Sequence, residues 1–246
     1  MNRRTVRSGT RAILAFSADG RRIFAGEIDG TLATWDWAAG VASGSRRTPP
    51  ADREILALAT GRGRVIVAHR NLTVTVLDDQ TQREIWRFHP LSAAFSLAVS
   101  PDGRLLAAGT WIGSIVIWDL DTGQQVNELK GQARGVVGLD FSPDGRLLVS
   151  ASLGGPMWVW DVAAGLWIAT VPARPVGAER IRFVDDGRHL AIGYQDGEVE
   201  VRDLTYFFRH AAGQAPYQLA QLRATGAAVP RADDVLAWSR RVLAGR

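Results

Sequence analysis

The chain of 246 residues contains no cysteine and only one lysine, Lys130. The lack of cysteine excludes a disulfide framework and thiolate metal sites, and it leaves the redox state of the compartment open. The basic start, MNRRTVRSGTR, is followed by no apolar segment, and no apolar run approaches the roughly 18 residues of a membrane-spanning helix. We therefore expect a soluble, cytoplasmic protein with neither an export signal nor a membrane span.

Sequence motifs for catalysis, cofactors and metals are also missing. There is no Gly-rich phosphate loop, no nucleophile-elbow serine and no His-Glu-x-x-His helix. The four histidines show no metal-ligand spacing: His69, His89, His189 and His210. We assign no catalytic, cofactor-binding or metal-binding residue and expect a protein that is not an enzyme. A hydrolase or lactonase that uses carboxylates stays open as a lesser alternative.

Positive charge is carried almost entirely by arginine, with a formal net charge of +4 and a pI of about 10.2. An arginine-rich surface can suit nucleic acid, but binding of that kind usually needs a clustered basic patch. The arginines of this chain are scattered along the sequence. We therefore do not expect nucleic acid as a partner.

What the chain does contain is a tandem repeat between Ala94 and Asp161. FSLAVSPDGRLLAAGTWIGSIVIWDL is followed 42 residues later by VVGLDFSPDGRLLVSASLGGPMWVWDV. Both copies alternate apolar and small or polar residues, which is the period of a strand. Each also has a Ser-Pro-Asp-Gly corner, in which proline presets φ and glycine supplies a positive φ. Each copy therefore predicts three short antiparallel strands.

The same unit recurs through most of the chain. The aspartate that closes it is found at intervals of 42, 41, 42 and 42 residues, at Asp36, Asp78, Asp119, Asp161 and Asp203. We align the apolar pairs of the first strands as Leu14/Phe16, Ala57/Ala59, Leu97/Val99, Leu139/Phe141 and Ile181/Phe183. Five units are therefore expected. The second is the weakest, because its corner lacks the Asp-Gly pair.

With Trp-Asp ends in three copies, Ser-Pro-Asp-Gly corners and a period near 42, the chain resembles the WD-repeat β-propeller family, whose repeat is about 40–45 residues long. The resemblance implies an all-β fold of about five four-stranded antiparallel blades in a domain over 1–204. The blades are expected near 12–47, 54–88, 94–130, 136–171 and 179–204. Trp35, Trp118 and Trp160 are assigned to the core.

The chain departs from the family pattern at a hydrogen-bonded tetrad. The Gly-His pair that the family often places before the first strand is replaced by Ser8-Gly9 and Gly131-Gln132, and the aspartate of the second turn remains only as Asp29 and Asp196. We therefore expect packing, rather than the tetrad, to hold the blades together.

Two questions of organisation stay open in the sequence. A strand at 3–7 could complete the last blade and close a five-blade ring, which we favour, or the blades could form an open arc completed by another chain or a missing segment. An open ring would leave room for a homodimer. Residues 205–246 are expected to form a short helical extension, which either packs on the propeller or binds a partner.

The resemblance places the loops before the first strands and between the second and third strands on one face. The residues on this face that we expect to bind a partner are Arg11, Arg53, Arg70, Trp111, Arg134, Leu153, Arg174, Tyr194 and Gln195. Trp, Tyr and Arg are the types that anchor interfaces. Trp111 either anchors a partner in this way or packs over the mouth of the central channel. The expected function is a non-catalytic scaffold for a protein or peptide partner, with a sensor or regulatory module that docks through the C-terminal helices as the alternative.

Overall fold

The computed structural model describes residues 12–37, 39–47, 54–185 and 187–204, which form nineteen strands in five blades. Blade 1 comprises β1 (Ala12–Phe16), β2 (Arg22–Glu27), β3 (Thr31–Asp36) and β4 (Val41–Arg47). Blade 2 comprises β5 (Ile55–Gly61), β6 (Arg64–His69), β7 (Val74–Asp78) and β8 (Glu84–Phe88). Blade 3 comprises β9 (Ala94–Val99), β10 (Leu105–Thr110), β11 (Ile115–Asp119) and β12 (Gln125–Leu129).

Blade 4 comprises β13 (Val136–Phe141), β14 (Leu147–Ser152), β15 (Met157–Asp161) and β16 (Leu166–Val171). Blade 5 has three strands within the described residues: β17 (Ala178–Val184), β18 (His189–Tyr194) and β19 (Val199–Asp203). Within each blade, strands that follow one another in sequence pair antiparallel. The all-β fold of five antiparallel blades expected from the repeat is confirmed.

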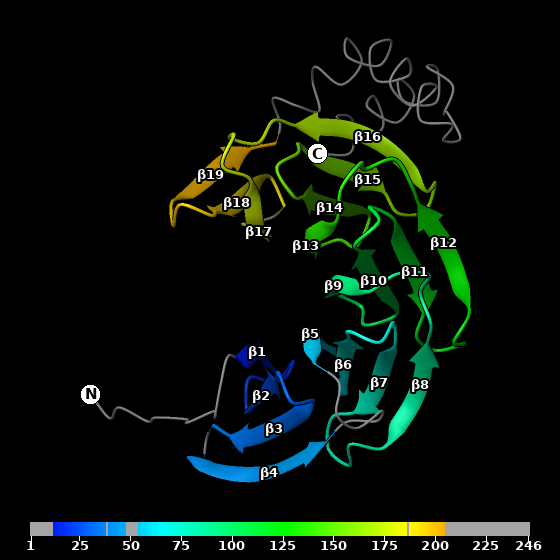
Figure 1. Cartoon of the computed structure of the whole chain (residues 1–246), viewed down its shortest axis with the longest axis vertical. Coiled ribbons are helices and arrows are strands. Elements are labelled where there is room, and N and C mark those ends of the chain that lie inside the picture. Colours follow the sequence, from blue (N-terminus) through cyan, green and yellow to red (C-terminus); the bar gives the residue numbers. More distant parts are fainter. Residues whose placement is uncertain (1–11, 38, 48–53, 186, 205–246) are drawn as a thin grey trace.

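The five blades lie around a common axis as an arc, with the first strand of each blade innermost (Figure 1). A gap separates β17–β19 from β1–β4 (Figure 1). Within the described residues, the arc is open at this gap. The strand expected at 3–7 and the helical extension expected at 205–246 both lie outside the described residues.

The Ser-Pro-Asp-Gly corners form as their residue types demand. In blade 3 the hydroxyl of Ser100 donates to Oδ1 of Asp102 at 2.5 Å, and the same carboxylate accepts the backbone N–H of Arg104 at 3.0 Å. The Ser100 hydrogen bond, followed by that of Arg104, lowers the pKa of Asp102. Gly103 adopts a φ of 72°, which an L-residue with a Cβ rarely occupies. The corner of blade 4 repeats this arrangement with Ser142, Asp144 and Gly145.

In blades 1 to 4, the aspartate that ends the third strand holds the turn into the fourth strand. The carboxylate of Asp119 accepts a hydrogen bond from Nε of Arg104 at 2.7 Å. It also accepts hydrogen bonds from the backbone N–H groups of Thr122 at 3.0 Å and Asp121 at 2.9 Å. The Arg104 hydrogen bond, together with these backbone donors, lowers the pKa of Asp119 to about 2. Asp161 makes the equivalent turn contact to the N–H of Ala164. These carboxylates are therefore committed to structure.

The predicted alignment of the first strand of blade 2 is wrong by one residue. Leu58 lies opposite Val67, and Thr60 lies opposite Val65. Leu58 and Thr60 are therefore the counterparts of Leu14 and Phe16, one residue later than the predicted Ala57/Ala59 pair. The cause is a tighter hairpin: Arg62 and Gly63 both have positive φ, at 46° and 72°, and form a two-residue turn of the kind that matches strand twist.

The core lies between blades rather than inside each one. Four clusters of buried side chains join blade 1 to 2, 2 to 3, 3 to 4 and 4 to 5. Trp118 and Trp160 are buried as predicted, and Nε1 of Trp160 donates to Oγ of Ser150 at 2.8 Å. Trp35 is only partly buried, because no blade covers its side of blade 1 within the described residues.

Candidate interaction face

One end of every blade from 2 to 5 is built by two loops joined through a backbone hydrogen bond. The turn between the second and third strands donates to the loop that precedes the first strand. The pairs are Arg70 to Glu54 at 2.9 Å, Trp111 to Ala93 at 2.9 Å, Leu153 to Gly135 at 3.0 Å and Gln195 to Gly177 at 3.3 Å. The repeat therefore brings both sets of loops to the same face of the propeller, as the sequence predicted. We call residues 28–30, 70–73, 89–93, 111–114, 130–135, 153–156, 172–177 and 195–198 the loop face.

Trp111 is the large aromatic residue of this face. Its side chain is 53% exposed, and its ring rests against Phe95 of the inner strand β9 with 5.1 Å between ring centroids. Gly135 lies directly beside it, where a Cβ would come within 3.0 Å of the indole. The indole is therefore held from two blades while about half of it stays available. The indole therefore packs against Phe95 and leaves about half of its surface exposed.

Arg134 adjoins the turn that carries Trp111. The backbone carbonyl oxygens of Gln132 and Arg134 lie so close to Gly113 that a Cβ there would come within 2.0 Å and 3.0 Å of them. The Arg134 side chain is exposed, and no ion pair to it is found in the described part of the chain. The backbone at Arg134 thus adjoins the Trp111 turn, and a guanidinium nitrogen of Arg134 lies beside Gly154 in the corresponding turn of blade 4.

The other two arginines that can be placed are already paired. Arg70 forms an ion pair with Glu54, and this hydrogen bond raises the pKa of Arg70. Arg174 pairs with Glu198 and, at 3.4 Å, with Asp196, and the hydrogen bond to Glu198 raises its pKa. Their charge is partly neutralised within the chain. Arg11 and Arg53 lie outside the described residues.

Tyr194, Leu153 and Gln195 differ in how much they offer to a partner. Tyr194 is buried: its hydroxyl donates to Glu200 at 2.8 Å, and its ring lies 5.1 Å beneath the guanidinium of Arg174. Burial, followed by the hydrogen bond to Glu200, raises the pKa of Tyr194. Leu153 is partly buried and Gln195 is exposed. Tyr194 therefore positions Arg174 instead of presenting an aromatic surface.

The prediction from sequence missed apolar side chains on the loop face. Exposed large apolar residues of these loops, besides Trp111, are Ile28, Leu72, Leu91, Ile112 and Val176. Their signal was present in the repeat, since Ile28 stands at the turn position that Trp111 takes two blades later. Leu72 also carries an unusual positive φ of 66°. Apolar side chains around an exposed tryptophan are characteristic of an interface.

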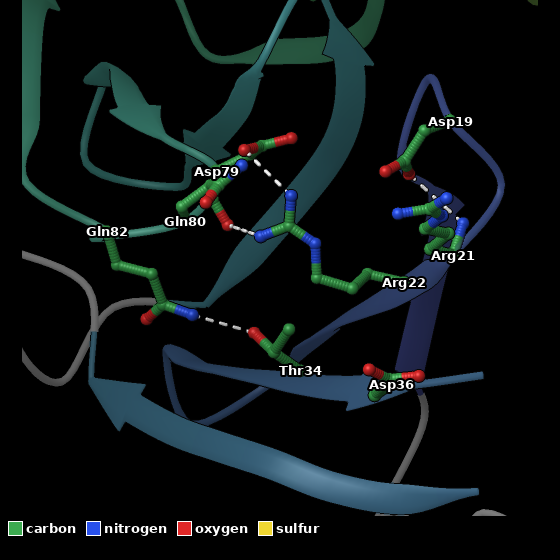
Figure 2. Close-up of a pocket in the computed structure, with 8 residues that line it drawn as sticks. All are labelled: Asp19, Arg21, Arg22, Thr34, Asp36, Asp79, Gln80 and Gln82. Atoms are coloured by element: carbon green, nitrogen blue, oxygen red, sulfur yellow. Dashed lines mark hydrogen bonds and ion pairs between the residues drawn. The ribbon is translucent and has the colours of Figure 1, made fainter. Parts of the chain in front are cut away.

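A polar pocket lies between blades 1 and 2 on the face of the propeller opposite the loop face (Figure 2). Its volume is about 340 Å³, and it is lined by Asp19, Arg21, Arg22, Thr34, Asp36, Asp79, Gln80 and Gln82. Arg22 points across it to Asp79 at 2.9 Å, and the Gln82 amide donates to the Thr34 hydroxyl at 2.7 Å (Figure 2). These contacts join the two blades. Within the described residues, no group of three or more His, Asp and Glu side chains could hold a metal.

The comparison with known protein families agrees with the blade arrangement of the structure. The family model for the WD domain, G-beta repeat, matches residues 81–119 and 123–161. Two repeats of this family therefore match within residues 81–161, and the five antiparallel blades of the structure have the arrangement of a WD-repeat β-propeller.

Among curated proteins, the chain is similar to Autophagy-related protein 16 of Arabidopsis thaliana, with 27% identity over 129 residues. This match covers 50% of the chain and 25% of that relative, so the two are alike over part of their lengths only. In the part of the chain that the structure describes, no helix has the length and apolar character needed to cross a membrane.

Proposed function

We propose that this protein is a non-catalytic scaffold in the cytoplasm that binds a protein or peptide on its loop face, centred on Trp111 and Arg134. The observation that carries the proposal is the half-exposed indole of Trp111, held in place by Phe95 and Gly135. A rigid aromatic side chain loses little conformational entropy when it is buried by a partner, which is why tryptophan is enriched among binding hot spots.

The surroundings of Trp111 support the same reading. Ile112 beside it is exposed, Leu72 is exposed on the corresponding turn of blade 2, and Leu91 is exposed on the loop between blades 2 and 3. Arg134 adds a cation that is free to pair with a carboxylate of the partner. This combination suits a peptide or protein segment with an apolar anchor next to an acidic residue. The name of the relative associates that protein with autophagy, and a role for this chain in autophagy forms part of the proposal.

Trp111→Ala and Arg134→Glu are expected to reduce partner capture, Trp111→Ala by tenfold or more, because loss of a hot-spot tryptophan usually costs about 2 kcal/mol or more of binding free energy. The measurement is capture by the immobilised chain from an extract of its own organism, quantified by mass spectrometry against wild type. Val126→Ala is the matched control, since Val126 is equally exposed but lies on the outer strand β12. Equal capture by all of these proteins, with unchanged thermal melts, would rule out this face.

A further inference from the structure

The last strand of blade 5 exposes two valines at positions that are buried in other blades. Val199 is 75% exposed and Val201 is 61% exposed. Their counterparts in blade 4, Met157 and Val159, are both 0% exposed, because blade 5 covers them. The strand registers establish the equivalence: Met157 lies opposite Ala151 as Val199 lies opposite Gly193, and Val159 lies opposite Val149 as Val201 lies opposite Ala191.

Blade 1 exposes apolar residues on its opposite side, the side that faces the preceding blade in blades 2 to 5. Leu14 is 61% exposed and Phe16 is 57% exposed on the inner strand β1. Their counterparts in blade 4, Leu139 and Phe141, are 4% and 5% exposed, because blade 3 covers them. Blade 1 therefore carries the side of a blade that normally receives the preceding blade.

The arginines of β17 do not cover the two valines on the exposed side of blade 5. Arg182 and Arg180 project from β17, but both guanidinium groups turn back toward blade 4. Arg182 pairs with Asp140 at 2.7 Å, and Arg180 donates to the carbonyl oxygen of Val137 at 3.4 Å. On β18, the residues opposite the two valines are the small residues Ala191 and Gly193.

We propose that this protein associates head to tail with a second copy of itself, so that the Val199 and Val201 side of blade 5 packs on the Leu14 and Phe16 side of blade 1 in the other copy. The chain already makes contacts of this kind between blades 1 and 2, 2 and 3, 3 and 4, and 4 and 5. Within the described residues, the exposed sides of blade 1 and blade 5 are the two halves of one more such contact. This surface is separate from the loop face.

A second copy fits because each end supplies what the other lacks. Packing buries two β-branched side chains and a leucine–phenylalanine pair that are now in water, and removal of such apolar area drives association. A head-to-tail contact generates a ring if the rotation closes and an open chain of copies if it does not. In both cases the assembly contains two or more chains.

Sedimentation of the full chain over a wide concentration series tests this proposal. Wild type should sediment at the mass of two or more chains, and Leu14→Glu and Val201→Glu should each be monomeric, since a buried unpaired carboxylate weakens such a contact about 100-fold or more. Val126→Glu, on an outer strand, should behave as wild type.

Mixing the two monomeric variants identifies the geometry. Each retains one intact end, so an equimolar mixture of Leu14→Glu and Val201→Glu should form a heterodimer through the intact Val201 end of the first and the intact Leu14 end of the second. Thermal melts near that of wild type establish that both variants are folded. A monomeric wild type, self-association that survives in Leu14→Glu, or a mixture that stays monomeric would each overturn the proposal. Because the loop face is intact in these variants, capture through Trp111 would be unaffected by any of these results.

Discussion

Gly113→Ala is expected to lower the free energy of unfolding by about 3 kcal/mol or more. Gly113 has a φ of 86°, and a Cβ at this position would come within 2.0 Å of the carbonyl oxygen of Gln132 and 3.0 Å of that of Arg134. These are backbone atoms, which cannot move aside as the end of a side chain can. The turn that carries Trp111 would therefore be pushed away from blade 4. Chemical denaturation monitored by tryptophan fluorescence measures the loss.

Gly197→Ala is the matched control for the clash. Gly197 takes the same turn position in blade 5 with a φ of 85°, but a Cβ there would meet nothing within 4 Å. It should cost only the positive-φ term of about 1–2 kcal/mol. Equal losses in the two variants would show that the contact between the turn and residues 132–134 is not close.

Trp160→Ala is expected to lower the free energy of unfolding by about 3–5 kcal/mol, the usual cost of removing a large buried aromatic side chain. Trp160 is buried in the cluster between blades 3 and 4, and its indole N–H donates to Ser150. The substitution creates a cavity and leaves the Ser150 hydroxyl without this donor. Denaturant titration followed by circular dichroism gives the change in free energy.

Trp111→Ala serves as the comparison, because it removes the same side chain from a half-exposed position. It should cost about 1 kcal/mol or less, as surface substitutions usually do. A loss for Trp160→Ala no larger than that for Trp111→Ala would contradict the assignment of the first to the core and of the second to the surface.

The fold was accessible from sequence because it rests on local signals. Asp102 and Gly103 form the corner that their residue types dictate, and Trp118 and Trp160 are buried where the repeat places them. Blade 2 was misaligned by one residue because its two-residue turn shortens the first connection. A change of turn type shifts the register of a strand without altering its apolar composition.

The loop face was predictable in position but not in detail. The turn of Trp111 and the loop of Arg134 meet as the repeat implied, whereas the pairing of Arg174 with Glu198 and the burial of Tyr194 depend on where side chains meet. Exposure of Leu14 at one end of the arc could not be read from the repeat either. The same apolar residue type is buried in one blade and exposed in another, depending on whether a neighbouring blade is present.

Amide hydrogen exchange on the complex with the captured partner tests the scaffold proposal most directly. Exchange should slow on binding in residues 111–114 and 130–135, where Trp111 and Arg134 lie, and should stay unchanged at the corners 100–104 and 142–146 at the opposite end of the same blades. Protection confined to those corners or to the outer strands, with the loop face unaffected, would contradict it.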